Sequence, residues 1–288
     1  MNHKERTTKM RRLLLTWYQK AKRDLPWRKT QDPYAIVLSE VMLQQTQVDR
    51  VIPKWEAWLQ LFPTWASLAH AKTADVLKAW SGLGYNRRAL MLQKLAATVE
   101  EWGSFPQDEE SMRTLPGIGP YTAGAVAAFA FRIKGSAPVD TNIDRVLRRV
   151  FGYHKKDAKA VAALAKEVVP TNVASWNHAL MDLGASKCTA RRPQCETCPL
   201  QTICASYPCK GDDIVKVKQK KFEGSDRMYR GRLLKALHKN VILRRNNIAK
   251  EIGLSDNLHI QRIIDGLQKD GFISIDAQGN VRIAEMKE

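Results

Sequence analysis

The stretch LPGIGPYTAGAVAAFAF, residues 115–131, decides the fold. Gly117 and Gly119 stand two residues apart in a short turn, and a run of small apolar residues typical of a buried helix follows them. In such a turn the backbone N–H groups at the start of the next helix can hold a phosphate without a side-chain charge. Two glycines in a turn are more often a plain helix connection, so the interpretation depends on the rest of the chain.

On both sides of this turn, residues 10–205 carry a helical pattern. Apolar positions recur at spacings of three and four, as in Leu13, Leu14 and Trp17, and Pro and Gly fall between the segments. Alternating strand patterns are missing from this part of the sequence. We therefore predict an all-α domain over residues 1–205.

Charge and composition point to a nucleic-acid partner. The 288 residues are 44% hydrophobic, and 47 Lys and Arg against 29 Asp and Glu give a formal net charge of +18. Such a field attracts polyanions, although a single basic run such as KVKQKK (216–221) can be only a solvated linker. No apolar run approaches the roughly 18 residues of a membrane span, and the start MNHKERTTKMRR lacks a secretory signal. We expect a cytoplasmic, nucleoid-associated protein.

The cysteines are concentrated in one place. Cys188, Cys195, Cys198 and Cys204 form the spacing C-x6-C-x2-C-x5-C, and only Cys209 lies outside it. In a reducing compartment clustered cysteines are better suited to a metal than to disulfides. Four thiolates suit either zinc or a [4Fe–4S] cluster, and the spacing favours iron. Cys209 is expected to be a free thiol.

The C-terminal residues read as a separate small domain. Residues 206–227 have the composition of a basic linker. In residues 228–288 we predict helices over 230–239, 246–252 and 258–269, followed by a hairpin in 272–284 with a Gly-Asn turn. This order is typical of a winged helix-turn-helix domain, whose third helix would bring Gln261, Arg262 and Lys269 to DNA. A protein-docking module on the same scaffold is the alternative.

Two carboxylates are candidates for catalysis. Asp140 precedes a helix in PVDTNIDRVLRR, where an N-cap is the simpler interpretation. Glu40 lies among Ile36, Val37 and Met42, an apolar setting that would raise its pKa and keep it protonated. A protonated acid and an ionised carboxylate in one cleft are the two groups that break a glycosidic bond through an oxocarbenium-like transition state.

Several motifs in order make residues 8–205 resemble a known family. LPWR (25–28), SEVMLQQTQV (39–48), GLGYNRRA (82–89), LPGIGPYTAGAV (115–126), VDTN (139–142) and the four-cysteine spacing are similar to the helix-hairpin-helix DNA glycosylases with a [4Fe–4S] cluster, and within them to the MutY adenine glycosylases. The resemblance implies a two-lobed helical fold, a [4Fe–4S] cluster as cofactor, and double-stranded DNA with a mismatched or damaged base pair as the partner of a monomer.

The resemblance also implies the reaction. Adenine opposite guanine or 8-oxoguanine would be flipped out and its N-glycosidic bond hydrolysed. Glu40 would protonate the departing base at N7, and Asp140 would stabilise the sugar cation or capture it transiently. Related endonuclease-type enzymes carry a lysine where this chain has Tyr121, and tyrosine cannot form a Schiff base. A monofunctional glycosylase is therefore expected.

Further site residues are implied only by the resemblance. Gln45 and Tyr85 would fill the gap left in the DNA stack, although a surface amide and a core aromatic are the simpler interpretations. The base pocket would contain Arg23, Trp27, Arg28 and Asp182. The DNA backbone would be bound by Gly117, Gly119, Thr122, Asn142, Arg191 and Arg192.

The match has two departures. MutY enzymes usually continue into a NUDIX-like domain that reads oxidised guanine, whereas this chain continues into the winged-helix pattern, and Thr141 stands where glycine is common.

Two other functions stay open. One is a mismatch-specific thymine or uracil glycosylase, against which Gln44 and Gln45 speak because those relatives tend to have basic residues there. The other is an iron–sulfur DNA-binding regulator without catalysis.

Overall fold

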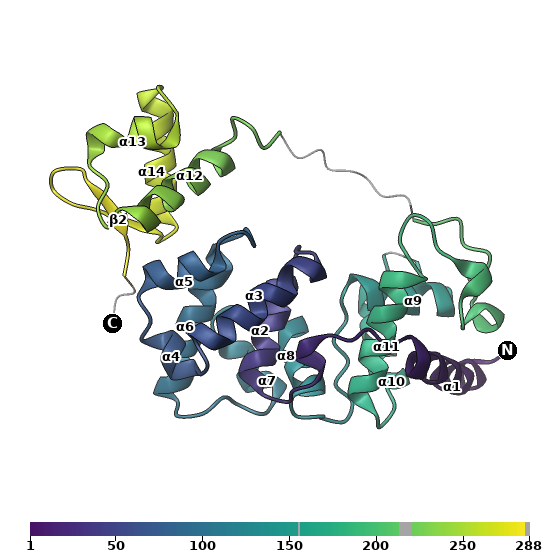
Figure 1. Cartoon of the computed structure of the whole chain (residues 1–288). Coiled ribbons are helices and arrows are strands. Elements are labelled where there is room, and N and C mark those ends of the chain that lie inside the picture. The colour runs from purple at the N-terminus through teal and green to yellow at the C-terminus, as the bar shows by residue number, and fades with distance from the viewer. Residues whose placement is uncertain (155, 213–220, 286–288) are drawn as a thin grey trace. The chain divides into compact units, whose positions relative to one another are not determined.

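The computed structural model describes residues 1–154, 156–212 and 221–285. They are predominantly helical, as predicted (Figure 1). The chain divides into two compact units. The first unit comprises Met1–Val48 and Ser104–Val215, and the second comprises Asp49–Gly103 and Lys216–Glu288. No helix among the described residues is long and apolar enough to cross a membrane.

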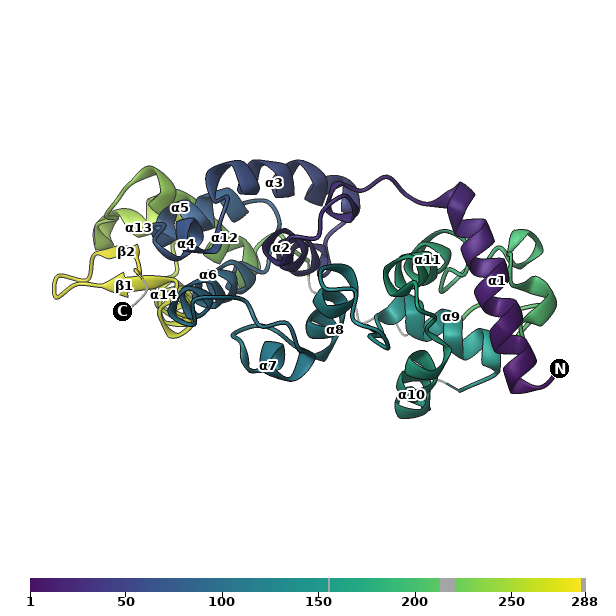
Figure 2. The same ribbon diagram turned by 90° about the horizontal axis from the view of Figure 1, so that it is seen from below.

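The first unit holds the glycine-rich turn and the cysteines. Its elements are α1 (His3–Ala21), η1 (Pro26–Arg28), α2 (Pro33–Leu43), α7 (Glu109–Thr114), α8 (Pro120–Phe129), α9 (Thr141–Phe151), α10 (Ala158–Val168), α11 (Val173–Ser186), η2 (Cys195–Thr197) and η3 (Gln201–Ile203). In both ribbon views α1, α9, α10 and α11 lie side by side (Figures 1 and 2). Their apolar faces form one core around Leu14, Leu147, Leu164 and Trp176.

Helices α2 and α8 are buried on nearly every side, because both are apolar around their whole circumference. Asp32 caps α2, with Pro33 in its first turn, and the helix ends at Leu43. The small residues of α8 allow close packing, and a Cβ added at Gly124 would already touch the Pro138 backbone at 3.5 Å. The two helices pack against each other and bring their polar side chains together.

The glycine-rich turn joins α7 to α8 as a helical hairpin. Gly117 has a φ of 76°, a left-handed conformation that favours glycine. Gly119 is the N-cap of α8 and makes no side-chain cap hydrogen bond, and Pro120 occupies the first turn. The first backbone N–H groups of α8 therefore have no capping side chain, as a phosphate-binding helix start requires.

The second unit contains the remaining helices and the sheet. Its elements are α3 (Val48–Leu61), α4 (Trp65–Ala69), α5 (Thr73–Trp80), α6 (Arg87–Glu101), α12 (Asp226–Lys239), α13 (Arg245–Ile252), α14 (Asn257–Lys269), β1 (Ile273–Ile275) and β2 (Val281–Ile283). Trp58 packs edge-to-face on Trp80, with ring centroids 5.5 Å apart, and anchors the core of α3 and α5.

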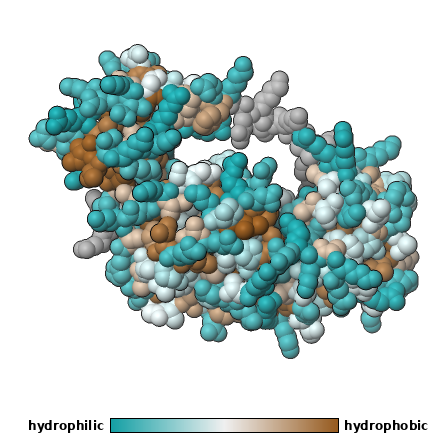
Figure 3. All heavy atoms as spheres, in the orientation of Figure 1, coloured by the Kyte–Doolittle hydropathy of each residue, from teal (hydrophilic) through white to brown (hydrophobic). Residues whose placement is uncertain are grey.

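The C-terminal elements follow the predicted order. The helix expected to begin at residue 230 already begins at Asp226, because the Ser225 side chain caps it by accepting from the Met228 N–H. Strands β1 and β2 pair antiparallel, with Ile273 opposite Ile283, and Leu243 forms a further bridge with Val281. The predicted linker at 206–227 includes residues 213–220, which lie outside the described residues. Hydrophilic side chains predominate on the face drawn in Figure 3.

Candidate active site and iron–sulfur site

Glu40 is a buried carboxyl held by one tyrosine. It lies on α2 with 7% of its surface exposed, among the apolar residues that the sequence predicted around it. The Tyr121 hydroxyl, from the first turn of α8, donates a hydrogen bond of 2.7 Å to Glu40 Oε2. Burial raises the pKa of Glu40 to about 7, against the lowering effect of this hydrogen bond. A pKa in this range allows Glu40 both to carry a proton and to release it near neutral pH.

Asp140 is the N-cap of α9. Its Oδ1 accepts hydrogen bonds from the backbone N–H groups of Asn142 (2.9 Å) and Ile143 (2.7 Å), and its Oδ2 accepts one from Asn142 Nδ2 (2.8 Å). The N-cap interpretation is thus correct. The cap also fixes the carboxylate at the positive end of α9, where the helix dipole favours a negative charge.

Glu40, Tyr121 and Asp140 form one electrostatic unit. The charge of Asp140 contributes to raising the pKa of Glu40. Burial raises the pKa of Tyr121 well above its ordinary value, and the charges of Glu40 and Asp140 add to the increase. The three side chains come from α2, α8 and the start of α9, so motifs up to 100 residues apart meet in one place.

A second polar cluster lies beside this site. The Asp182 carboxylate on α11 accepts hydrogen bonds from Arg23 Nε (2.5 Å) and from both terminal nitrogens of Arg28 (2.8 Å each). Burial raises the pKa of Asp182, but the hydrogen bond and charge of Arg28, together with Arg23, lower it overall. Arg28 also lowers the pKa of Glu40, which places the cluster within electrostatic reach of the acid. Trp27, also in the predicted pocket, is buried.

His178 belongs to the same region, and the sequence analysis missed it. Its ring stacks on Phe129 with centroids 4.1 Å apart, and burial, with the nearby charge of Arg28, lowers its pKa to about 3. The imidazole is therefore neutral at physiological pH. A lone histidine in a helix carries no spacing signal, and only its packing against α8 reveals this placement.

Gln45 and Tyr85 both project from strained backbone. Their φ angles are 57° and 48°, in the left-handed region that non-glycine residues rarely adopt. Gln45 follows the end of α2 and is exposed, and Tyr85 has 53% of its surface exposed. The simpler interpretation of Tyr85 as a core aromatic is therefore wrong.

Residues predicted at the DNA backbone are placed in different ways. Arg191 and Arg192 are exposed. Thr122 is buried in the first turn of α8, so its side chain does not reach the surface. The Asn142 amide is bound internally: it donates to Asp140 and accepts from Arg145 Nη2 at 2.7 Å. Arg145 also donates to the carbonyl oxygens of Gly184 (2.7 Å) and Cys188 (2.6 Å), which joins the Asp140 cap to the cysteine loop.

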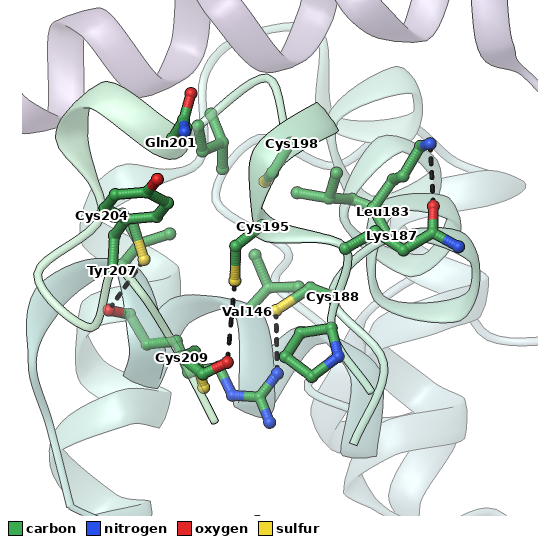
Figure 4. A pocket seen from close by; sticks show the side chains of 15 residues that line it. Val146, Leu183, Lys187, Cys188, Cys195, Cys198, Gln201, Cys204, Tyr207 and Cys209 are labelled. Carbon is green, nitrogen blue, oxygen red and sulfur yellow. Dashed lines mark hydrogen bonds between the residues drawn. The ribbon is translucent and has the colours of Figure 1, made fainter. Parts of the chain in front are cut away.

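The four spaced cysteines line one cavity of about 30 Å³ (Figure 4). All are reduced, and Arg149 Nη1 donates to Cys188 Sγ at 3.3 Å. Burial raises the pKa of Cys198 to about 11, so a cationic group is needed to form its thiolate at neutral pH. No group of three His, Cys, Asp or Glu side chains in the described ranges is spaced for a single metal ion. The four thiols line one cavity and supply the donor set that an iron–sulfur cluster requires.

Two protein families match the parts of the chain that contain the two sites. Residues 38–171 match the HhH-GPD superfamily base excision DNA repair protein family, and residues 188–204 match the iron–sulfur binding domain of endonuclease III. The cysteines at 188, 195, 198 and 204 therefore form an iron–sulfur site of this type. When bound, the cluster ties the loop between its ligands to the rest of the first unit.

The chain is also similar to adenine DNA glycosylases along most of its length. It is 40% identical over 284 residues to the adenine DNA glycosylase of Mycolicibacterium smegmatis, with 94% of each chain covered. It is 43% identical over 241 residues to that of Mycobacterium tuberculosis, covering 78% of this chain and 77% of the other. The human adenine DNA glycosylase is 41% identical over 214 residues, covering 68% of this chain and 39% of the human protein.

Solved structures agree on the fold. A thermostable thymine-DNA glycosylase is 31% identical with a TM-score of 0.67, covering 71% of this chain and 97% of its own. A non-covalent endonuclease III–DNA complex, at 23% identity and a TM-score of 0.62, covers 71% of this chain and 96% of its own and shares the fold. With the site geometry and the relatives together, the chain belongs to the adenine DNA glycosylase family, within the HhH-GPD superfamily of base excision DNA repair proteins.

Proposed function

We propose that this protein removes adenine mispaired with guanine or 8-oxoguanine from duplex DNA by hydrolysing its N-glycosidic bond. The observation that carries the proposal is Glu40, a buried carboxyl with a pKa of about 7, beside Tyr121 and within electrostatic reach of Asp140. A general acid works best when its pKa lies near the operating pH. The adenine DNA glycosylases named above support adenine as the base.

The two carboxylates have different roles in the proposed reaction. Glu40 delivers its proton to N7 of the flipped adenine, so that the base departs as a neutral molecule. Asp140, fixed as a helix N-cap, faces the developing positive charge of the sugar and stabilises it, or captures it until water arrives. Tyr121 keeps Glu40 oriented and has no amine to form a Schiff base, so the enzyme leaves the DNA strand uncut.

We expect the protein to bind phosphates of the DNA backbone and to insert two side chains into the base stack. The uncapped start of α8 after Gly119, and the exposed Arg191 and Arg192, would bind phosphates. Gln45 and Tyr85, both exposed on strained backbone, would fill the stack after the base is extruded. The ion-paired set of Arg23, Arg28 and the buried Asp182 would shape the base pocket. One flipped base requires only a monomer.

We further propose that residues 228–288 form a winged-helix domain that contacts DNA through α14. Three helices and a hairpin with the Leu243–Val281 bridge support this. The linker predicted at 206–227 is shorter, because residues 205–212 are bound to the first unit and α12 begins at Asp226. The acidic residues near α14 are occupied internally: Asp256 caps the helix, and Asp270 pairs with Arg230. We expect replacing Arg262 and Lys269 with alanine to weaken DNA binding, whereas replacing the exposed Lys235 and Lys239 of α12 should not. Equal effects would contradict the assignment of α14.

The decisive test is a panel of duplexes with A:G, A:8-oxoguanine, A:C, T:G and U:G pairs, treated with enzyme and then with hot alkali. Breakage at adenine only, and only after alkali, is expected. Breakage at T or U would instead favour the mismatch thymine or uracil activity suggested by the thymine-DNA glycosylase likeness. Strand cleavage without alkali, or borohydride trapping on DNA, would contradict a monofunctional enzyme.

Two variants separate catalysis from folding. Asn is as good an N-cap as Asp, so Asp140→Asn keeps the start of α9 while removing the charge. Glu40→Gln removes the acid with little change in volume. Both variants should bind DNA and lose excision. If either variant retains full excision, the role proposed for its carboxyl is wrong. If wild type itself excises no base and both variants bind DNA as wild type does, the protein is better described as a non-catalytic iron–sulfur DNA-binding regulator.

A further inference from the structure

The chain returns to the iron–sulfur site after the last family cysteine. Past Cys204, the N–H groups of Ala205 and Ser206 donate to the carbonyl oxygens of Val150 (3.0 Å) and Arg149 (3.1 Å) at the end of α9. Further on, the Asp212 N–H donates to the Ala190 carbonyl at 2.8 Å. Residues 205–212 are therefore fixed at both ends against elements that surround the cysteine cavity.

Side chains reinforce this return segment. The Asp212 carboxylate pairs with Arg149 Nη2 at 3.1 Å, and the same guanidinium donates through Nη1 to Cys188 Sγ. Gly211 has a φ of 100°, and a Cβ there would lie 2.4 Å from the Arg191 carbonyl oxygen. Only glycine allows the segment to approach the cysteine loop this closely.

Cys209 sits in the middle of the segment and lines the same cavity as the other four cysteines. Cys195 Sγ lies 4.0 Å from the Cys209 carbonyl oxygen, and Figure 4 shows the Cys195 side chain pointing toward it. Cys209 is a free thiol, as expected from the sequence, but its position in this cavity was not predicted.

The Cys209 sulfur is weakly held where it is. It accepts one hydrogen bond from the Gly211 N–H at 3.4 Å, and sulfur is a weak acceptor. A change of side-chain rotamer about its Cα–Cβ bond redirects the sulfur without moving the fixed backbone. Cys188 and Cys204, by contrast, have their sulfurs in contact with Arg149, at 3.3 Å from its guanidinium and 3.4 Å from its carbonyl oxygen.

We propose that Cys209 is a reserve ligand of the iron–sulfur cluster that can replace Cys195. In the exchange, the Cys209 thiol releases its proton to water as its sulfur binds iron, and the departing Cys195 thiolate takes up a proton. No electron is transferred, so no oxidant or reductant is needed. The exchange keeps the cluster at four thiolate ligands when Cys195 is lost or modified.

The test compares Cys195→Ala, Cys195→Ala with Cys209→Ala, and Cys209→Ala alone, purified anaerobically as full chains. Iron per chain and visible absorbance of the cluster are the readouts. A [4Fe–4S] cluster contains about four iron atoms, and we expect Cys195→Ala and Cys209→Ala to retain most of them while the double variant loses nearly all. Equal iron loss in Cys195→Ala and in the double variant would overturn the proposal.

A second measurement covers the case in which Cys195→Ala does not fold, as judged by circular dichroism. Wild type and Cys209→Ala, both with all four family cysteines, are exposed to hydrogen peroxide and an iron chelator. The reserve ligand should make cluster bleaching several-fold slower in wild type, and equal rates would overturn the proposal. Neither readout depends on glycosylase activity, so failure here is separate from failure of the proposed function.

Discussion

The Tyr121 hydroxyl donates a 2.7 Å hydrogen bond to Glu40 Oε2 and so sets how readily the buried acid gives up its proton. This bond lowers the pKa of Glu40, against burial, which raises it to about 7. In Tyr121→Phe the lowering contribution disappears, and the pKa of Glu40 rises. In the mechanism proposed above, excision requires protonated Glu40, so the alkaline fall in the single-turnover rate should move to higher pH than in wild type. Tyr18→Phe, a buried tyrosine on α1, is the control and should leave the midpoint unchanged.

The raised pKa of Glu40 also predicts a pH-dependent stability. Between its unperturbed value of 4.5 and about 7 the folded protein binds more protons than the unfolded chain, so this group lowers stability as the pH rises through that window. Glu40→Gln removes the effect and should raise the free energy of unfolding above pH 7 by on the order of 3 kcal/mol. Urea unfolding at pH 4.5 and pH 8 measures it. A variant no more stable than wild type at pH 8 would show that Glu40 is not buried as described.

The sequence anticipated the acid, because its apolar neighbours are adjacent to it in the chain. Ile36, Val37 and Met42 surround Glu40 within one helix, so their burial follows from a local pattern. The partner Tyr121 is 81 residues away, and no periodicity predicts that their side chains meet. The same limit applies to Cys209, whose return to the cysteine cavity depends on backbone contacts to α9 and to the loop after Cys188. Local patterns predicted the helices and strands, whereas the contacts between these elements could be found only from the structure.

Breaking the buried ion pair at Asp182 should destabilise the first unit. In Asp182→Ala, Arg28, with 9% of its side chain exposed, keeps a charge without its partner, and leaving a buried charge unpaired costs about 3–5 kcal/mol. Arg23→Ala should cost much less, because the Arg23 side chain is 37% exposed and water can replace it. The urea concentrations at the midpoints of unfolding compare the stabilities of the two variants. Similar losses in both variants would contradict this difference in burial.

Arg88 should control how Tyr85 is presented. Its guanidinium lies 5.1 Å from the Trp80 ring and 5.6 Å from the Tyr85 ring, and Nη2 donates to the carbonyl oxygens of Leu83 (3.2 Å) and Gly84 (3.0 Å). Lysine lacks the planar fork that makes these contacts together. Arg88→Lys should therefore reduce base extrusion. The fluorescence of 2-aminopurine placed next to the mismatch measures this extrusion. The exposed neighbour Arg87 is changed to lysine as a control. Equal losses in both variants would contradict a specific role of Arg88 at Tyr85.

Gly184 is expected to tolerate no side chain, because α11 crosses α9 there. A Cβ would lie 2.6 Å from Asn142 Cβ and 3.1 Å from the Asn142 carbonyl oxygen. Asn142 must then shift. Its side-chain amide and its backbone N–H both donate hydrogen bonds to the Asp140 carboxylate, so Asp140 would move with it. Gly184→Ala should lower stability by about 1–3 kcal/mol, as overpacking does, and also lower the excision rate by displacing Asp140. Gly124→Ala, whose Cβ meets Pro138 only at 3.5 Å, is the matched control and should change neither. A Gly184→Ala enzyme with wild-type stability and rate would mean that α9 and α11 are farther apart than described.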